Sequence, residues 1–548
     1  MKLFAGLTLA LGTLPLCAAP GGDGPMNVIV QFRGGDLPRQ VAQFERSGAK
    51  LHRSLPLIHA AAFSIPRNSL DRARQSPEVT FVSEEAAVQQ TLYDVTPAVG
   101  ATTASSYGWT GQGIGVAILD SGISVNPDLT ATSNKSRLVY QKSFTPETVT
   151  VDVYGHGTHI AGIVGGRAAN SSGASYTKTF RGIAPSVNLV SLIVLDRYGN
   201  GIESNVIAAI SQAIQLKSTY NIRVMNLSLG KPVTVSYKND PLCQAVEAAW
   251  KAGIVVVVAA GNQGRNNAMS TQGYSTITSP GNDPYVITVG ALKTMGTPSR
   301  ADDVLASYSS KGPTLLDRIA KPDLVAPGNQ VISVLSQDGR FRNTNPANCV
   351  SATFYQKNGN AGPGDKYFWM SGTSMASPVV AGAAALLLQK DPTLTPDQVK
   401  YRLMKTASKT FPLYSSSTDP VTHQVYTIRH DLFSVGAGYV DVMAALNNAD
   451  KPAARALSPV AVYNATTQTV QLQDNAFGTS VVWGDSTTPW ETVWGSNVIP
   501  GTSVVWGDSV VWGDSFLAGF SVVWGDSVVW GDSAPASEVD SLLLNGEL

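Results

Sequence analysis

The chain has 548 residues, of which 43% are hydrophobic, enough for a large core and for more than one domain. Its 39 basic and 39 acidic residues cancel, which excludes a general attraction to nucleic acid or to an anionic membrane. Charged residues make up only 14% of the chain and glycine occurs 51 times, a composition typical of a loop-rich exported protein.

Residues 1–19 have the pattern of a secretory signal peptide. Lys2 precedes an apolar run over residues 3–16, and small residues follow it. This run is too short to cross a bilayer and no later run reaches 18 apolar residues, so we expect no membrane span. Lipoprotein modification at Cys17 is disfavoured, because Leu16 stands where a small residue is normally required. We therefore expect a secreted protein, extracellular or associated with the cell surface.

Residues 26–91 are predicted to form a small α+β module. Its strand-like runs are residues 27–32, 59–65 and 79–82, and its helix-like stretches are residues 38–47 and 68–75. A polar, turn-rich stretch, residues 89–106, follows the module and is expected to link it to the next domain.

From residue 113 the pattern changes to buried strands that alternate with helices. The apolar runs are residues 115–119, 187–195, 224–229, 254–260 and 286–289, and the helix candidates are residues 158–165, 203–216, 242–251 and 379–388. Strands that are apolar throughout are typical of a parallel sheet covered on both faces. We expect an α/β domain over residues 92–447.

The composition shifts again after residue 448, with an expected linker at 448–475 and a repeat tail at 476–548. The sequence Ser-Val-Val-Trp-Gly-Asp-Ser begins at residues 480, 503, 509, 521 and 527. The repeats fit either a stacked β coil or a repetitive, partly disordered tail. They contain no histidine and cannot supply a catalytic base.

The two remaining cysteines, Cys243 and Cys349, leave a disulfide and a pair of free buried thiols both open. No cysteine and histidine cluster has the spacing of a zinc site, so no metal ligand is assigned.

Three polar residues interrupt the predicted strands and helices where open α/β sheets place their sites. Asp120 follows the run 115–119, His156 opens a helix, and Ser374 stands at the mouth of the apolar helix that contains residues 379–388. A serine nucleophile, a histidine base and an aspartate that orients the imidazole are what nucleophilic acyl transfer requires.

The order of these residues, Asp then His then Ser, is that of subtilisin. Over residues 92–446 the chain resembles the subtilisin-like serine proteases. The resemblance rests on five motifs in the family's order: Asp120-Ser121-Gly122, His156-Gly157-Thr158-His159, Asn226-Leu227-Ser228-Leu229-Gly230, Ala259-Ala260-Gly261-Asn262 and Gly372-Thr373-Ser374-Met375-Ala376-Ser377-Pro378. It implies a three-layer α/β fold with a mostly parallel central sheet, preceded by a small α+β propeptide, and a serine endopeptidase that forms an acyl-enzyme on Ser374.

The same resemblance implies the remaining site residues. Asn262 would join the Ser374 backbone N–H as the oxyanion hole. Two segments would pair with extended substrate, and Thr278 would lie near the floor of the pocket for the residue before the scissile bond. The paired segments contribute Ser228, Leu229, Gly230, Gly199 and Gly201.

The implied partners are protein or peptide substrates and the chain's own propeptide, an inhibitor that the enzyme removes by cutting within residues 89–93. The polar stretch 336–366 departs from the family pattern and is expected to form a surface excursion near the primed side of the cleft. No cofactor is required for the chemistry. Asp128 matches a calcium-binding position of some relatives, which leaves structural calcium open, and His159 is expected to pack rather than to bind metal.

Two other functions compete with this interpretation. The repeats fit an adhesion or display protein that uses the protease domain as a scaffold, with surface association through the tail. An esterase or lipase would use similar chemistry, but the motif order and the absence of Gly-x-Ser-x-Gly disfavour it.

Overall fold

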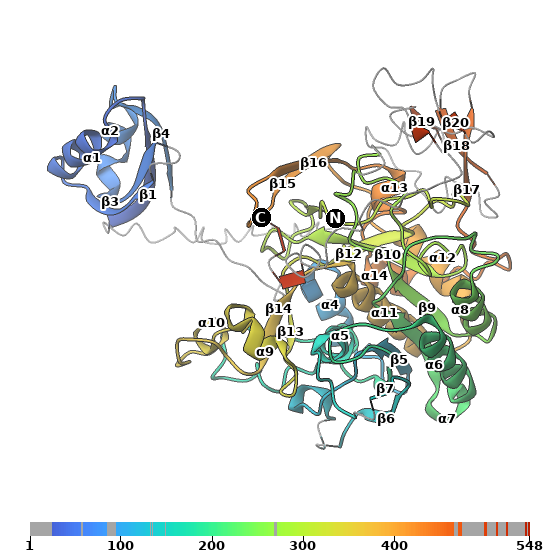
Figure 1. Ribbon diagram of the computed structural model, residues 1–548. Coiled ribbons are helices and arrows are strands. Elements are labelled where there is room, and N and C mark those ends of the chain that lie inside the picture. Colours follow the sequence, from blue (N-terminus) through green and yellow to red (C-terminus); the bar gives the residue numbers. More distant parts are fainter. Residues whose placement is uncertain are drawn as a thin grey trace, which may run out of the picture. The chain divides into compact units, whose positions relative to one another are not determined.

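The computed structural model describes residues 25–55, 59–84, 95–131, 133, 135–147, 150–267, 271–464, 469–473, 498–500, 511–512, 522–523, 543–544 and 546–547. The chain divides into two compact units, Met1–Gln89 and Gln90–Leu548 (Figure 1). The expected signal peptide with Cys17, the expected cut at residues 89–93 and most of the repeats lie outside the described residues.

The smaller unit is a four-stranded antiparallel sheet in the order β2-β3-β1-β4, with two helices on one side of it (Figure 1). Its elements are β1 (Pro25–Phe32), α1 (Leu37–Arg46), β2 (Lys50–Leu55), β3 (Ala60–Pro66), the 3₁₀ turn η2 (Arg67–Ser69), α2 (Leu70–Arg74) and β4 (Val79–Glu84). Val28, Val30 and Phe63 are fully buried in a core that belongs to this unit alone.

The larger unit is built on an eight-stranded sheet in the order β11-β10-β9-β8-β5-β7-β6, with β12 also paired to β10. Its strands are β5 (Gly115–Asp120), β6 (Leu138–Ser143), β7 (Asn188–Ile193), β8 (Ile222–Leu227), β9 (Val255–Ala259), β10 (Ile287–Lys293), β11 (Val304–Leu305) and β12 (Leu324–Pro327). All pairs are parallel except β10 with β11. The residues of β5 and β9 are all buried, as expected for strands that are covered on both faces.

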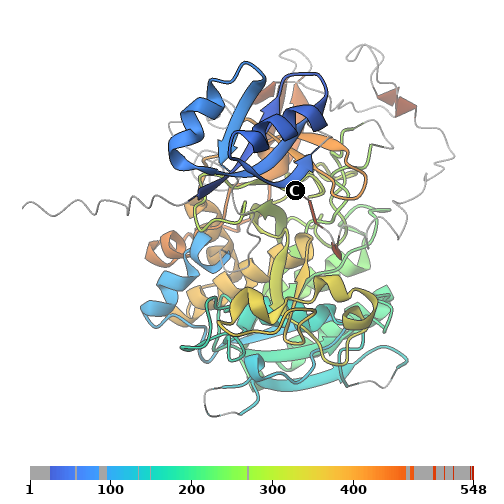
Figure 2. The same ribbon diagram turned by 90° about the vertical axis from the view of Figure 1, so that its left-hand side faces the viewer.

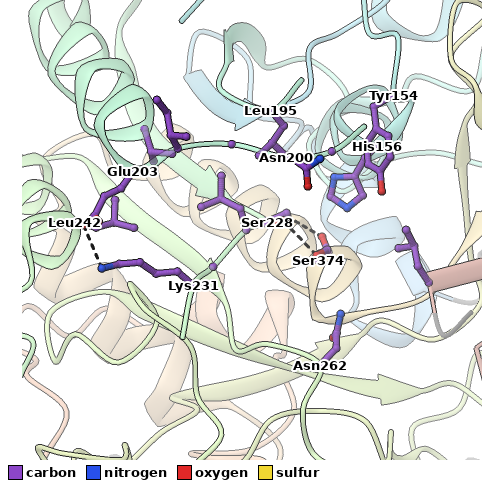
Figure 3. Close-up of a pocket in the computed structure, with 17 residues that line it drawn as sticks. Tyr154, His156, Leu195, Asn200, Glu203, Ser228, Lys231, Leu242, Asn262 and Ser374 are labelled. Atoms are coloured by element: carbon purple, nitrogen blue, oxygen red, sulfur yellow. Dashed lines mark hydrogen bonds and ion pairs between the residues drawn. The ribbon is translucent and has the colours of Figure 1, made fainter. Parts of the chain in front are cut away.

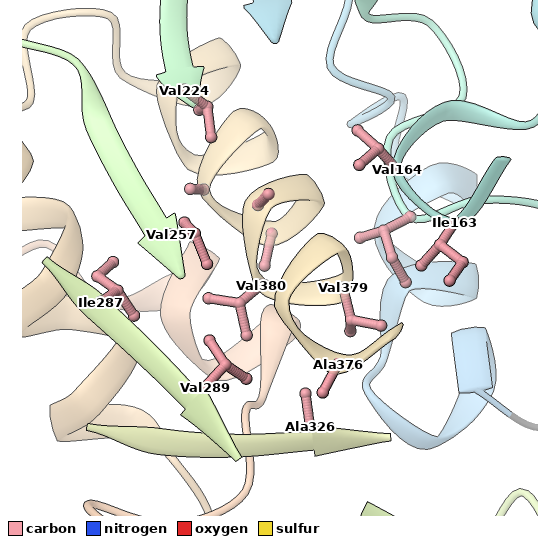
Figure 4. Packing of buried hydrophobic residues seen from close by; sticks show 14 of the residues in the cluster. Ile163, Val164, Val224, Val257, Ile287, Val289, Ala326, Ala376, Val379 and Val380 are labelled. Carbon is pink, nitrogen blue, oxygen red and sulfur yellow. The ribbon is translucent and has the colours of Figure 1, made fainter. Parts of the chain in front are cut away.

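Helices cover both faces of this sheet and complete three layers. One face carries α5 (His156–Gly165) and α11 (Thr373–Lys390), and α6 (Glu203–Gln215) and α8 (Pro241–Lys251) pack together on the other. Figure 4 shows Val380 of α11 beside Val257 of β9 and Val289 of β10, while Val379 projects from the other side of the helix. Each of these buried valines contributes roughly 1.5–3 kcal/mol relative to an exposed one.

Shorter elements complete the larger unit. The helices are α3 (Val95–Ala98), α4 (Ala101–Ser106), α7 (Lys217–Tyr220), α9 (Phe341–Thr344), α10 (Ala352–Tyr355), α12 (Pro396–Thr406), α13 (Leu432–Val435) and α14 (Val442–Asn447), with 3₁₀ turns η4 (Pro127–Leu129) and η5 (Pro346–Asn348). The strands are β13 (Val331–Val334), β14 (Tyr367–Met370), β15 (Tyr414–Thr418), β16 (Val425–Arg429), β17 (Val460–Asn464), β18 (Thr469–Gln473), β19 (Val498–Pro500), β20 (Val511–Trp512) and β21 (Val522–Val523). None of the helices within the described ranges has both the length and the apolar character that crossing a membrane requires.

The predicted three-layer α/β fold with a mostly parallel sheet is confirmed. Several strands were not predicted from the sequence, among them β2, β6, β11 and β12. β2 and β6 lie at sheet edges, where one side of a strand is exposed. β2 ends the small sheet, and β6 lies at the edge of the large one, at the bottom of Figure 2. β6 is only half-buried, so its sequence lacks the continuous apolar run of the central strands.

Candidate active site

The predicted site residues meet at one edge of the large sheet. Asp120 ends β5, Ser228 directly follows β8, and Asn262 lies three residues beyond the end of β9. These three strands are neighbours and parallel, so their carboxyl ends lie side by side. The N-termini of α5 and α11, which carry His156 and Ser374, lie at the same edge, where open α/β sheets bind their ligands.

Asp120 and His156 form a buried pair. The Nδ1 atom of His156 lies 2.8 Å and 2.9 Å from the two carboxylate oxygens of Asp120, and the residues are 5% and 1% exposed respectively. The carboxylate fixes the proton on Nδ1 and leaves Nε2 as the basic atom. Burial disfavours the charged ring, but the attraction of Asp120 and Asp152 outweighs it and holds the pKa of His156 above its ordinary value of 6.5.

Asp152 is a second buried carboxylate, which the sequence analysis overlooked. It accepts hydrogen bonds from the N–H groups of Gly155 and Thr158, both at 2.7 Å, and so caps the start of α5 from outside the helix. The hydroxyl of Ser121 also donates to Asp152, at 2.8 Å, and the Ser121 N–H donates to Asp120 at 2.7 Å. Ser121 therefore connects the two carboxylates. An aspartate just before a predicted helix start was the available signal.

Ser374 lies in the first turn of α11, where backbone N–H groups have no partner within the helix and the helix dipole favours negative charge. Pro378, four residues on, has no N–H to donate to the Ser374 carbonyl. The Ser228 hydroxyl donates to that carbonyl instead, at 2.8 Å, while the Ser374 hydroxyl donates to the Ser228 carbonyl at 3.3 Å. These two bonds fasten the start of α11 to the end of β8.

Asn262 is oriented by the residue before Ser374. Its side-chain oxygen accepts hydrogen bonds from the N–H of Thr373 at 2.9 Å and from the Thr373 hydroxyl at 3.0 Å. The amide nitrogen is left as a donor, and Asn262 lines the cavity together with Ser374 (Figure 3). A donor at this place can stabilise an oxyanion that forms beside Ser374.

One cavity contains most of the predicted residues (Figure 3). It is lined by His156, Ser374 and Asn262, and also by Ser228, Leu229, Gly230, Gly199 and Gly201. Gly199 has φ +82°, and a Cβ there would lie 2.6 Å from the ring of Tyr154. Glycine is thus required for this wall to come close to the aromatic ring.

The cavity wall away from Ser374 combines apolar side chains with an ion pair that the sequence analysis did not find. Leu195, Val206 and Leu242 line it. At its rim Lys231 lies 3.2 Å from Glu203 and 3.1 Å from the buried Asp240. These charges come from three separate loops and helix starts, so no local motif marked them.

Asp120, Thr278 and His159 do not line this cavity. Thr278 packs behind the wall, where a Cβ on Gly230 would meet its hydroxyl at 2.5 Å, and its role in the pocket remains a prediction. His159 is fully buried, and its Nε2 lies within hydrogen-bond distance of the carbonyls of Val331 and Phe368, at 3.2 Å and 3.0 Å. The environment of His159 is that of a packed, neutral histidine.

The surroundings of Asp128 do not fit a calcium ion. Its two carboxylate oxygens accept hydrogen bonds from the Asn170 N–H at 2.8 Å and the Tyr367 hydroxyl at 2.7 Å. Its carbonyl accepts from the guanidinium of Arg137 at 3.0 Å. Among the residues whose placement is described, no three His, Cys, Asp or Glu side chains gather as metal ligands would. Cys243 and Cys349 are free and buried.

Known proteins are similar to this chain in sequence. The sequence profile of the Subtilase family matches residues 111–478. Serine protease AprX of Bacillus subtilis (strain 168) is 41% identical over 307 residues, which are 55% of this chain and 62% of that protein. Subtilisin E of the same organism is 33% identical over 367 residues, covering 66% of this chain and 78% of the relative. A crystal structure of a cold adapted subtilisin-like serine proteinase covers 55% of this chain and 84% of its own, at 29% identity and a TM-score of 0.39.

An α/β fold that gathers a serine, a histidine and an aspartate at one sheet edge defines the class of serine hydrolases. The family profile covers more than half of the chain, and the match to subtilisin E covers most of that relative. The chain therefore belongs to the subtilase family of serine proteases, as the sequence motifs predicted.

Proposed function

We propose that this protein is a secreted serine endopeptidase that hydrolyses peptide bonds through an acyl-enzyme on Ser374. The observation that carries the proposal is the buried Asp120–His156 pair, whose imidazole lines the same cavity as Ser374 and Asn262. His156 takes the proton of Ser374 as the serine attacks the peptide carbonyl, and Asp120 keeps the imidazole in the required tautomer. The amide of Asn262 and the backbone N–H of Ser374 stabilise the oxyanion. His156 then protonates the leaving amine and activates the water that hydrolyses the acyl-enzyme.

Substrate would bind as an extended strand between two segments of the cavity wall, Gly199 to Gly201 and Ser228 to Gly230. Thr278 would lie near the floor of the pocket for the residue before the scissile bond. The likeness to serine protease AprX and subtilisin E supports proteins or peptides as substrates.

The precursor would carry a signal peptide at 1–19 and an inhibitory propeptide at 26–91, removed by the enzyme's own cut within 89–93. The catalytic domain at 92–447 would be followed by a linker at 448–475 and a repeat tail at 476–548, through which the enzyme would associate with the cell surface. The separate core of the small unit supports a detachable propeptide.

The test replaces Ser374 with alanine in the full-length chain. We expect the purified parent to release the propeptide and to react with a serine-directed phosphonate, and the Ser374→Ala protein to do neither. Ser106→Ala, at an exposed serine of α4, is the matched control and should behave like the parent. Propeptide release from purified Ser374→Ala protein would contradict self-processing, and an unlabelled parent would contradict the nucleophile.

A further inference from the structure

Two short stretches far along the chain, residues 543–544 and 546–547, lie beside the candidate active site and are together called the segment below. Leu543 lines the cavity that contains His156 and Ser374. Its carbonyl accepts a hydrogen bond from the N–H of Ser371 at 2.8 Å, and the carbonyl of Leu544 accepts one from the side chain of Asn348. Leu543 is 9% exposed, so the contact buries its side chain.

The segment is held by a buried binding site for the carboxylate of Glu547, formed by Arg265, Ser307 and Lys293, which we call the receptor. The side chain of Glu547 is fully buried and lies 2.7 Å from the guanidinium of Arg265. The N–H of Ser307 donates to the carboxylate at 2.7 Å, the Ser307 hydroxyl also donates, and Lys293 lies 4.0 Å away. A buried charge is tolerated only with such partners, so Glu547 has one defined place.

The backbone of Gly546 and Glu547 is bound as specifically as the Glu547 carboxylate. Asn329 donates to the carbonyl of Glu547 at 2.9 Å and accepts from its N–H at 3.0 Å. Gly546 has φ +64°, and a Cβ there would lie 2.5 Å from the hydroxyl of Ser371 and 2.8 Å from Asn329. The receptor thus selects a Gly-Glu pair in one register.

The position of the segment relative to Ser374 indicates which part of a substrate it would displace. In the proposed function the acyl side of the substrate lies along Gly199 and Ser228. Figure 3 shows the lining residues Glu203 and Leu242 on one side of Ser374. The segment instead contacts Ser371, just before the nucleophile turn, and Asn348 of the excursion 336–366. Phe341 of this excursion packs on the cavity residue Tyr154, with ring centroids 4.7 Å apart.

We propose that the segment is a built-in peptide ligand of the leaving-group side of the cleft, and that it excludes extended substrates until displaced. The proposal rests on the proposed peptidase function. A peptide that continues beyond the scissile bond must compete with Leu543, while a substrate with a small leaving group need not. Because the segment occupies the cleft for part of the time, the apparent affinity for peptides that continue beyond the scissile bond is lowered. The apparent affinity for substrates with a small leaving group is not.

The experiment uses the enzyme after propeptide release, with residues 541–548 still attached. It compares an acyl-peptide nitroanilide with a quenched fluorescent peptide that extends several residues past the cut. Gly546→Ala introduces the clash, and Glu547→Gln removes the charge that the receptor binds while leaving Arg265 paired with Asp419. We expect either change to raise kcat/KM for the long peptide about tenfold and to leave the nitroanilide within about twofold. Gly108→Ala is the matched control, since Gly108 has φ +84° and no neighbour that a Cβ would meet.

Added in trans to the Gly546→Ala enzyme, the octapeptide of residues 541–548 should inhibit cleavage of the long peptide, and its Glu547→Gln counterpart should inhibit less. Unchanged rates in the Gly546→Ala and Glu547→Gln enzymes would overturn the proposal. Equal losses of activity on both substrates together with a lower melting temperature would also overturn it, because they would show that the segment only stabilises the fold. A parent that cleaves neither substrate would overturn the peptidase function. Hydrogen exchange at the Glu547 amide in Ser374→Ala protein would then still decide whether the segment is docked.

Discussion

At the residue scale, the candidate base His156 is governed by a balance of burial and charge. Burial alone would lower its pKa, and the carboxylates of Asp120 and Asp152 reverse that effect. Only the neutral imidazole can accept the serine proton, so activity should fall as the pH drops through this raised pKa.

Replacing Asp120 with asparagine should therefore have two separable effects. We expect kcat to fall roughly 10⁴-fold, because the proton on Nδ1 is no longer fixed. The acid limb of kcat/KM should move to lower pH, because the negative charge that raises the pKa of His156 is lost. A pH–rate profile measures both. Asp152→Asn is the comparison, since Asp152 acts on His156 through charge without touching it. It should shift the limb less, and an equal shift in the two variants would contradict the assignment.

At the scale of elements, Arg137 is a buried cation that joins several segments. Its guanidinium donates to the carbonyls of Thr130, Asp128 and Val187 at 3.2 Å, 3.0 Å and 2.9 Å, and also to that of Gly165 at the end of α5. Burial lowers its pKa to about 10, which still leaves it charged near neutral pH. The guanidinium thus satisfies helix-end and loop carbonyls that would otherwise be buried without donors.

Arg137→Met should lower the free energy of unfolding by about 3 kcal/mol or more, because buried carbonyls lose their donors. Thermal or denaturant unfolding, followed in the Ser374→Ala background to prevent self-digestion, measures this. Arg223→Met is the control, since Arg223 also binds two carbonyls, of Pro392 and Leu394, from a more exposed position. Equal losses in the two variants would contradict the idea that burial makes Arg137 special.

Elements with a strong local pattern were predicted well from the sequence. The strands β5, β8 and β9 were visible because burial on both faces makes them apolar throughout, and the motifs at their ends led to Asp120, Ser228 and Asn262. Edge strands such as β2 and β6 lack that signal. Contacts between distant segments had none at all: Ser307 and Glu547 are 240 positions apart, and only the fold brings them together.

At the scale of the whole molecule, buried histidines should make the fold sensitive to acid. Burial lowers the pKa of His159 from 6.5 to about 3 and that of His430 to about 4, so the folded state binds fewer protons than the unfolded chain. Stability from these groups is fully present above about pH 6.5 and is lost as the pH falls toward the folded pKa values.

We expect His159→Gln to make the loss of folding stability at low pH less steep. In Ser374→Ala protein, the free energy of unfolding should fall between pH 6.5 and pH 3, by up to about 5 kcal/mol through His159. The double variant His159→Gln, Ser374→Ala should fall less steeply, whatever its stability at neutral pH. Denaturant unfolding at several pH values gives the slope, and parallel slopes for the two proteins would show that His159 does not titrate with folding.

The docked segment also gives the chain between Gln473 and Leu543 two fastened ends. On one side β18 pairs with β17. β17 is in turn held by the N–H of Ala461, which donates to the backbone carbonyl of Arg318 at 2.8 Å. On the other side Glu547 is held in its receptor. While the connection is intact, the ligand is held near its site at a high effective concentration. A single cut within the repeats would turn it into a free peptide that dilution carries away, so a nick there should act as an irreversible activation step.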